Sequence, residues 1–214
     1  CLVGPEVSIF AAIIDDQYLI FTPARDYKRA SDGDLGPNTG GMGAVASRQL
    51  VSKEMLERIE EEIVVPTVAG LNREGLPYRG FLYFGLMLTP TGPQIIEYNC
   101  RFGDPECQAV MPHEKGDLAA FCLAGANGAL RPDLISFDDG WSVCVILASA
   151  GYPESSRNGD LITGLGGHQR TGKCDSDARR NHQSDRVPSY RRKFPVPHVV
   201  GGNTAEGVFV AHKT

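Results

Sequence analysis

The 214-residue sequence predicts an α+β fold in which an antiparallel sheet is flanked by helices. Two pairs of apolar runs support this prediction, because each pair is joined by a short turn and is therefore typical of a β-hairpin. The third observation is a segment, residues 52–73, with the apolar period of an α-helix. A chain of this length can bury a core without disulfide or metal support.

The first predicted hairpin begins with residues 7–14 (VSIFAAII), which we interpret as a buried strand. A turn at Asp15-Asp16 leads into a second strand that starts at residues 18–21. Residues 25–47 then show no period and are rich in Gly, Asp, Asn and Pro, so they predict a long loop. Loops of this length are uncommon and often functional.

The predicted helix has an apolar stripe, because Met55, Ile59 and Ile63 recur at i, i+4 and i+8. Ser52 is suited to be its N-cap. Pro66 lies near the middle and is expected to kink or interrupt the helix, because proline has no N–H to donate.

The second predicted hairpin pairs residues 81–89 with residues 94–99, and it leads into the polar segment CRFGDPE. A short helix is expected over residues 116–129. Residues 130–140 are interpreted as a linker, and residues 141–148 (WSVCVILA) as another buried strand.

The net charge of -5 hides two unlike parts of the chain. Residues 166–214 hold nine Lys or Arg against four Asp or Glu, whereas the residues before them are strongly acidic. The apolar pattern also ends there, so we interpret residues 166–214 as an atypical tail, frame-shifted or disordered, with little regular structure. Its charges are mixed and its aromatic residues few, which argues against nucleic-acid binding.

Composition also narrows the class of protein. No apolar run approaches the roughly 18–20 residues of a membrane helix, and no leader opens the chain, so no membrane partner is expected. The six cysteines include no CxxC pair, which argues against a zinc site. We expect buried, free thiols in a cytoplasmic protein.

The first polar cluster is Glu97 and Asn99 at the end of a predicted strand. Residues at i and i+2 of a strand share a face, so a carboxylate and an amide oxygen lie side by side. Oxygen ligands in this number suit Mg²⁺, which also binds substrate phosphates. The alternative is that both side chains simply face solvent.

The second cluster follows at once, in residues 101–106 (RFGDPE). Arg101 continues the same alternation, and its guanidinium could clamp a phosphoryl group or a carboxylate. Asp104 and the proline after it would fix a sharp turn. A structural Arg–Asp pair in that turn is the alternative.

The third cluster combines Asp26, Lys28 and Arg29 with the glycine-rich residues 36–43 (GPNTGGMG). Backbone N–H groups in such a loop can cradle an anion. No GK[ST] follows the glycines, so this is no Walker A motif. A flexible surface loop is the alternative.

Together these segments resemble the phosphoribosylamine–glycine ligases, ATP-grasp enzymes of purine biosynthesis. The resemblance rests on DYKR at 26–29, GPNTGGMGA at 36–44 and EYNCRFGDPE at 97–106. GFLY at 80–83 and GYP at 151–153 match as well, and the similarity extends from about residue 4 to residue 165.

The resemblance implies a reaction that joins phosphoribosylamine to glycine and converts ATP to ADP and phosphate through a glycyl phosphate. It implies Glu97 and Asn99 as ligands of Mg²⁺ or Mn²⁺, Arg101 and Lys28 as catalytic residues, and Glu6 as a nucleotide-binding residue. Glu6 is the least matched of these, because Pro5 replaces a family glutamate. The residues implied to bind substrate and phosphate are Asp26, Asn38, Thr39, Gly40, Gly41, Met42, Gly43 and Asp104.

The resemblance also divides the chain. Residues 1–132 are similar to part of the ATP-grasp domain and residues 133–165 to the start of the final domain. The family's amino-terminal half has no counterpart here, so we expect the chain to be an incomplete copy that needs that half for activity. The alternative is a non-catalytic truncated product that binds Mg²⁺-nucleotide weakly.

Overall fold

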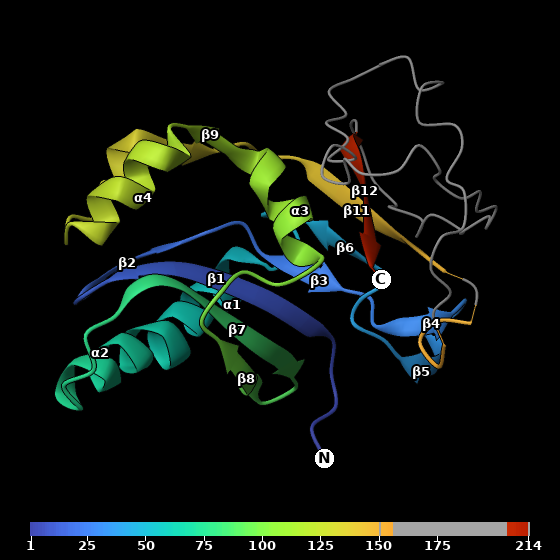
Figure 1. Cartoon of the computed structure of the whole chain (residues 1–214). Coiled ribbons are helices and arrows are strands. Elements are labelled where there is room, and N and C mark those ends of the chain that lie inside the picture. The colour runs from blue at the N-terminus through green and yellow to red at the C-terminus, as the bar shows by residue number, and fades with distance from the viewer. Residues whose placement is uncertain (150, 156–204, 214) are drawn as a thin grey trace.

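The computed structural model describes residues 1–149, 151–155 and 205–213, and its main feature is one twisted sheet between two groups of helices (Figure 1). Within the described residues the sheet has eight strands in the order β12-β11-β6-β3-β1-β7-β8, with β2 paired to β1. Neighbouring strands are antiparallel except β11 and β12. The predicted α+β class, with an antiparallel sheet and flanking helices, is confirmed.

The first predicted hairpin is present as β1 (Glu6–Ile14) and β2 (Gln17–Ile20). Asp15 turns the chain with φ of 57°, a left-handed conformation that Asp tolerates better than most residues. β1 also pairs along its whole length with β7 (Arg79–Thr89), from Glu6 opposite Met87 to Ile14 opposite Arg79. β1 is therefore an interior strand of the sheet.

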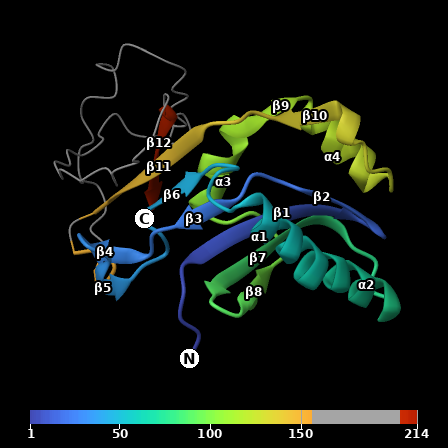
Figure 2. The same cartoon turned by 180° about the vertical axis from the view of Figure 1, so that it is seen from behind.

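Both faces of β1 are buried, because helices cover the sheet on both sides (Figures 1 and 2). On one face Val7, Ile9 and Ile13 pack with residues of the helical segment 53–73. On the other face Phe10 and Ala12 pack with residues of α3 (Glu106–Val110) and α4 (Leu118–Ala126). The buried strand predicted for residues 7–14 is therefore confirmed, and it is buried on both faces.

The predicted long helix is present as α1 (Lys53–Ile59), a π-helical segment (Glu60–Val64) and α2 (Val65–Arg73). The Ser52 hydroxyl accepts from the Met55 N–H at 3.2 Å and so caps α1 as predicted. The π-helical segment ends two residues before Pro66, which cannot donate to the carbonyl four residues before it. Pro66 therefore interrupts the regular α-helical hydrogen bonding without ending the helix.

The prediction of a long loop over residues 25–47 is wrong. That stretch contains four short strands, which are β3 (Ala24–Asp26), β4 (Arg29–Ser31), β5 (Leu35–Asn38) and β6 (Gly43–Ala46). β4 and β5 form a small hairpin, whereas β3 and β6 join the main sheet. Strands of three or four residues have too little sequence for a period, and pairing with the distant strands β1 and β11 stabilises β3 and β6.

The second predicted hairpin is β7 with β8 (Gly92–Asn99), and it is confirmed. The register shifts between Gly85 and Leu86, so Ile96 is an extra residue and Glu97 lies opposite Gly85. The segment CRFGDPE that follows turns at a cis Asp104-Pro105 peptide and enters α3. A single 3₁₀ turn (Met111–His113) and β9 (Glu114–Gly116) continue the chain.

The predicted linker at residues 130–140 is structured and is a second correction. It contains a 3₁₀ turn (Pro132–Leu134) and β10 (Ile135–Phe137), which pairs with β9. The predicted strand at 141–148 is β11 (Trp141–Ala148), and it pairs with β6 in the main sheet. The boundary between residues 132 and 133 stays a prediction.

Residues 205–213 differ from the expectation of a tail with little regular structure. They form β12 (Ala205–Lys213), which pairs in parallel with β11. The run Val208-Phe209-Val210 consists of strong strand formers, so it favours this conformation. The rest of the predicted tail, and the proposed shift of reading frame near residue 166, lie outside the described residues.

His113 is buried and connects three elements around α3. Its Nε2 lies 2.9 Å from the Ser142 hydroxyl on β11 and 3.2 Å from the Ala46 carbonyl on β6. Ser142 in turn donates to the carbonyl of Ala109 on α3. These bonds hold α3 against the sheet, because a buried polar group stays unpaired only at a cost.

The cysteines within the described residues are free, as predicted, but most are not buried. Cys1, Cys100 and Cys122 are exposed, Cys107 is half-buried and only Cys144 is buried. The expectation of burial is wrong for the exposed three, because their positions in chain ends, turns and outer helix faces follow from the tertiary fold. No helix in the described part of the chain is long and apolar enough to cross a membrane.

Candidate functional site

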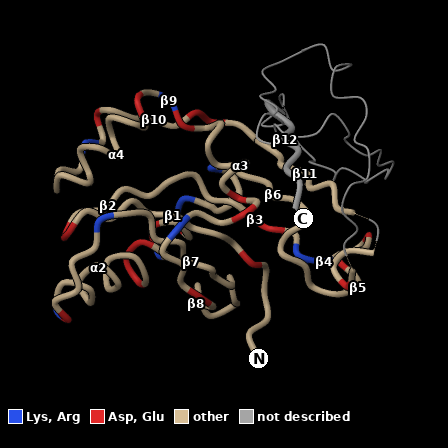
Figure 3. Tube along the Cα trace, in the orientation of Figure 1, with Lys and Arg blue, Asp and Glu red and all other residues tan. Residues whose placement is uncertain are grey.

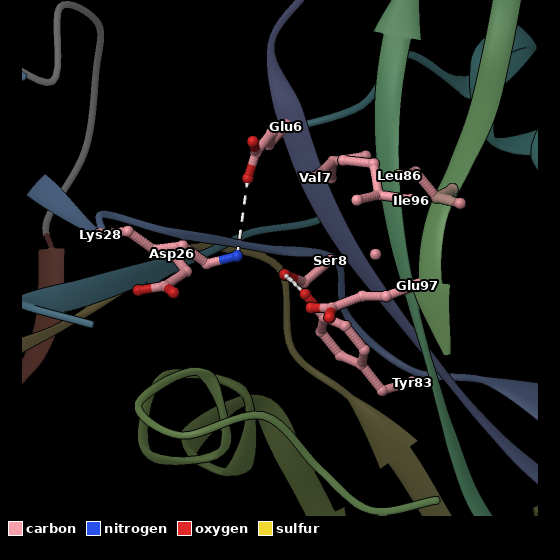
Figure 4. Close-up of a pocket in the computed structure, with 10 residues that line it drawn as sticks. Glu6, Val7, Ser8, Asp26, Lys28, Tyr83, Leu86, Ile96 and Glu97 are labelled. Atoms are coloured by element: carbon pink, nitrogen blue, oxygen red, sulfur yellow. Dashed lines mark hydrogen bonds and ion pairs between the residues drawn. The ribbon is translucent and has the colours of Figure 1, made fainter. Parts of the chain in front are cut away.

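Four residues that the sequence singled out meet in one pocket of the sheet (Figure 4). Glu6 begins β1, Asp26 ends β3, Lys28 follows β3, and Glu97 lies near the end of β8. The other residues of the lining are Val7, Ser8, Tyr83, Gly85, Leu86 and Ile96. The fold thus gathers charged side chains from three strands that are far apart in sequence.

The strand register explains how Glu97 reaches this pocket. Ser8 on β1 lies opposite Ala24 on β3 and opposite Gly85 on β7, and Gly85 lies opposite Glu97 on β8. A Cβ on Gly85 would lie 2.9 Å from Cγ of Glu97 and 3.3 Å from the Tyr83 hydroxyl oxygen. Glycine in this row therefore leaves the space in which the Glu97 and Tyr83 side chains converge.

Lys28 and Glu6 face each other across the open side of the pocket. The Lys28 Nζ lies 3.8 Å from Oε2 of Glu6, and the two side chains are 38% and 50% exposed. Arg25 donates from Nε to the Glu6 carbonyl oxygen at 3.1 Å. An exposed pair of this kind stabilises little, so both charges remain available to a ligand.

The floor of the pocket is a buried hydrogen-bond chain. The Ser8 hydroxyl donates to Oε1 of Glu106 at 3.1 Å. It also lies 3.2 Å from the Tyr83 hydroxyl (Figure 4). Glu106 is 3% exposed and Tyr83 is 5% exposed. The Ser8 hydroxyl therefore links the Glu106 carboxylate to the Tyr83 hydroxyl.

Burial raises the pKa of the Tyr83 phenol, and the Ser8 hydrogen bond opposes that rise. The charges of Glu106, Glu97 and Asp26 add to the rise, because each disfavours a phenolate nearby. Tyr83 is therefore a neutral phenol surrounded by three carboxylates from α3, β8 and β3.

The glycine-rich loop between β5 and β6 packs beside the pocket rather than into its lining. Thr39 fixes the loop, since its hydroxyl donates to the Lys28 carbonyl at 2.8 Å and accepts from the Gly41 N–H at 3.0 Å. Gly41 has φ of 104° and lies against Pro105 and the Asp26 carboxylate, where a side chain would not fit. Gly40 donates its N–H to the Tyr152 hydroxyl at 3.0 Å. Three more residues of the predicted set lie outside the lining: Asn38 at the end of β5, Met42 in the loop and Gly43 at the start of β6.

The CRFGDPE segment is anchored under the pocket by its phenylalanine. The Phe102 ring lies 4.4 Å from that of Phe81 and 5.1 Å from that of Phe10, measured between centroids. This contact places Glu106 beneath β1, where it reaches Ser8. The apolar residue in the polar motif is therefore the one that fixes its position.

Three other predicted residues do not line the pocket. Arg101 is exposed, and its guanidinium donates to the carbonyl of the next residue, Phe102, at 2.8 Å. Asp104 accepts from the Gln108 amide at 3.0 Å on α3. Asn99 is half-buried and lies two residues beyond Glu97 on the same face of β8.

Sequence reasoning missed Ser8, Tyr83 and Glu106 as site residues. Two features of the sequence could have indicated the site. Ser8 is a polar residue within an apolar strand, and Gly85, a glycine in the middle of another strand, is a sign of close approach by neighbouring groups. Glu106 is the last residue of a polar motif, and nothing in the motif itself indicates that this carboxylate is buried.

Comparisons with known proteins indicate the same family. A model of the phosphoribosylglycinamide synthetase ATP-grasp (A) domain matches residues 1–107. A phosphoribosylamine–glycine ligase of Chlorobaculum tepidum is 45% identical over 162 residues, which is 76% of this chain and 38% of the relative. The trifunctional purine biosynthetic protein adenosine-3 of Gallus gallus is 46% identical over 165 residues, 77% of this chain and 16% of that protein.

Solved structures agree with these relatives. The crystal structure of phosphoribosylamine–glycine ligase from Thermotoga maritima matches with a TM-score of 0.68 and 38% identity, covering 76% of this chain and 41% of that one. The phosphoribosylglycinamide synthetase of Anaerococcus prevotii shares the fold, with a TM-score of 0.52 at 14% identity.

The matched part of the chain spans about two fifths of the length of its single-function relatives. The match nevertheless includes the strands that build the pocket. The chain belongs to the phosphoribosylglycinamide synthetase family and carries the fold of its ATP-grasp domain.

Proposed function

We propose that this chain serves the ATP-dependent joining of phosphoribosylamine and glycine, and that its pocket binds the metal–nucleotide phosphates and the amino acid. The observation that carries the proposal is the meeting of Glu6, Asp26, Lys28 and Glu97 in one pocket. The relatives named phosphoribosylamine–glycine ligase support the choice of reaction.

The pocket residues fit a divalent metal ion. The lining presents the carboxylates of Glu6, Asp26 and Glu97 against the single ammonium of Lys28, so it has room for added positive charge. Glu97 and Asn99 offer two oxygen donors on one face of β8. A Mg²⁺ ion held by two protein ligands completes its coordination with water and phosphate oxygens.

The described residues contain no group of three or more His, Cys, Asp or Glu arranged to hold a metal. In the proposed site the ion is held by both the protein and the nucleotide phosphates. Such an ion, when bound, neutralises phosphate charge. We assign Glu97 and Asn99 to holding it.

The proposed reaction has two steps. A glycine carboxylate oxygen attacks the γ-phosphorus of ATP, and the bond to the bridging oxygen breaks to release ADP and leave glycyl phosphate. The phosphoribosylamine nitrogen then attacks the acyl carbon, the C–N bond forms, phosphate leaves with the electron pair of the C–O bond, and the nitrogen loses a proton.

The side chains act in these steps by position and charge, because phosphoryl transfer needs no protein nucleophile. Lys28 extends a cation over the pocket and would attract the phosphate oxygens. Arg101 lies in the open, where its guanidinium could turn from its own backbone to a phosphoryl group or a carboxylate. The loop at Gly40 and Gly41 would contact substrate beside Asp26.

The test is the binding of Mn²⁺–ADP to the chain, measured by calorimetry. We expect Glu97→Gln to weaken binding by roughly tenfold or more, because replacing even a residue that only supports a ligand costs 10–100-fold in metal affinity. The change keeps the size of the side chain and removes its charge.

Glu61→Gln is the matched control, since Glu61 is exposed on the π-helical segment and far from the lining. Its binding should equal that of the unchanged chain. Equal binding by Glu97→Gln and Glu61→Gln would contradict the assignment of Glu97 as a metal ligand.

A further inference from the structure

The GYP segment at residues 151–153 matches the family but does not line the pocket. Its Tyr152 hydroxyl reaches the glycine-rich loop instead, where it accepts from the N–H of Gly40, 112 residues away in sequence, at 3.0 Å. The turn that carries Tyr152 is closed by a bond from the Ser155 N–H to the Gly151 carbonyl at 2.9 Å. The segment is therefore a contact of the loop.

Four consecutive N–H groups of that loop, from residue 39 to residue 42, each have an acceptor within the chain. Two acceptors are backbone carbonyls of the residues that follow β3, and two are side-chain hydroxyls. Among these four acceptors, Tyr152 alone is distant from the loop in sequence. The donor–acceptor pairs are Thr39–Lys28, Gly40–Tyr152, Gly41–Thr39 and Met42–Tyr27.

Thr39 ties the loop to Lys28 through two hydrogen bonds to one atom. Its N–H and its hydroxyl both donate to the Lys28 carbonyl oxygen, at 2.7 and 2.8 Å. The same hydroxyl accepts from the Gly41 N–H at 3.0 Å. A displacement of Gly40 and Gly41 therefore acts on the backbone from which the Lys28 ammonium extends toward the pocket.

We propose that Tyr152 is a positioning residue of the pocket: it holds the Gly40 N–H and so fixes the loop, and the loop fixes Lys28 through Thr39. This inference rests on the proposed function and adds to it a residue from the segment that follows β11. Because Tyr152 acts through Lys28 and does not contact the ligand, its effect depends on the presence of Lys28.

Two features make a contact from outside the loop useful. Consecutive glycines at 40 and 41 give the backbone wide freedom, which a hydrogen bond from a separate turn restricts. Gly40 is exposed and the Lys28 side chain is 38% exposed, so packing alone does not fix either. A cation that is already in position binds a phosphate more tightly, because less freedom is lost on binding.

The experiment is a double-mutant cycle, with Mn²⁺–ADP binding to the chain measured by calorimetry. Tyr152→Phe keeps the ring and removes the hydroxyl. We expect it to weaken binding about two- to tenfold, the range for the net contribution of one neutral hydrogen bond. In the Lys28→Met background the same change should leave the affinity as it is, because the cation that it positions is gone.

Tyr18→Phe is the matched control, because the Tyr18 hydroxyl donates to Glu60 at 2.7 Å outside the pocket lining. Thr39 provides a second test if Tyr152→Phe does not fold. Thr39→Val keeps the shape of the side chain and removes the hydroxyl bonded to Lys28 and Gly41, so it should weaken binding at least as much. Thr39→Ser keeps a hydroxyl and should bind more tightly than Thr39→Val.

The cycle separates positioning from other roles. A loss of equal size with and without Lys28 overturns the inference, because Tyr152 would then act on the ligand or on the fold as a whole. Unchanged binding in Tyr152→Phe or, where that variant does not fold, in Thr39→Val also overturns it. Binding that depends on Glu97 but not on Tyr152 keeps the metal assignment and rejects the positioning role. A chain that binds no Mn²⁺–ADP rejects both.

Discussion

The two faces of β1 use the same nine-residue strand in different ways. Val7, Ile9 and Ile13 point to the α1–α2 side and meet apolar side chains there. The other face begins with Ser8, which meets a tyrosine and a glutamate, before Phe10 and Ala12 return to apolar packing. The face toward α1 and α2 packs in the apolar core, whereas the start of the opposite face lines the pocket.

The difference shows how the sheet combines a core with a charged site. On the pocket face the buried Ser8 hydroxyl and the buried Glu106 carboxylate are hydrogen-bond partners of each other. The exposed charges of the pocket, Glu6 and Lys28, lie at the start of β1 and just after β3. Figure 3 shows Lys, Arg, Asp and Glu of both signs distributed over the described helices, turns and strand ends.

The largest effect is expected on the apolar face. Ile9 is fully buried, and Ile9→Ala should lower the free energy of unfolding by about 2–5 kcal/mol, because it removes buried methyl groups and leaves a cavity. Urea unfolding followed by circular dichroism measures this change.

Ile9→Val is the matched control and should cost only about 0.5–1.5 kcal/mol. Mn²⁺–ADP affinity of the folded Ile9→Ala protein should stay within about twofold of the original. A large loss of affinity without loss of stability would show that the two faces are not separate in function.

A smaller effect on stability, but a clear one on binding, is expected at Gly85. Gly85→Ala puts a methyl group 2.9 Å from Cγ of Glu97 and 3.2 Å from Cε1 of Tyr83, so Glu97 must move. We expect Mn²⁺–ADP affinity to fall by roughly tenfold, as for other changes that misplace a metal ligand.

Gly80→Ala is the control, because it adds the same methyl group to the same strand, β7. Its Cβ would meet only Tyr78 at 3.7 Å, an ordinary contact. The two variants should have similar urea midpoints and differ in affinity. Equal affinity for Mn²⁺–ADP would mean that Glu97 does not depend on the gap at Gly85.

The smallest effect is expected at the turn after β1, where the ion pair is exposed. Arg79 binds Asp15 through two nitrogens, at 2.8 and 3.0 Å, and this hydrogen bonding lowers the pKa of Asp15 below its ordinary value of 3.8. A lowered pKa contributes stability above pH 3.8, and that contribution is lost as the pH falls through the folded value.

Asp15→Asn should therefore cost little at pH 7, and the difference from the original chain should vanish in acid. Asparagine also tolerates the left-handed backbone at this position, so the turn is kept. Urea midpoints at pH 7, 5 and 3 measure the difference. A difference that grows toward acid pH would contradict the pairing.

Long elements of the fold could be predicted from local pattern. The strands at β1, β7, β8 and β11 and the helix with its Ser52 cap have enough residues to show a period. The short strands of the 25–47 segment do not show a period. β3 and β6 are held by pairing with β1 and β11, whereas β4 and β5 pair with each other. The prediction of a linker at residues 130–140 was wrong for the same reason, because β10 has only three residues and pairs with β9.

The sequence also predicted only part of the charged site. Asp26, Lys28 and Glu97 stood in polar motifs, and the structure brings them together. Arg101 and Asp104 stood in an equally polar motif, yet they lie outside the lining. Glu106 faces inward from that motif because Phe102 packs beneath β1 and turns the segment.

The sequence by itself determined the kind of chemistry and the long elements, because residue types and periods are local properties. It placed carboxylates, a lysine and glycines in segments that resemble one family of ligases. Only the tertiary structure decided which side chains share the pocket, since that depends on strand register. The row from Ser8 through Gly85 to Glu97 crosses three strands, and a slip of one residue would turn Glu97 to the opposite face.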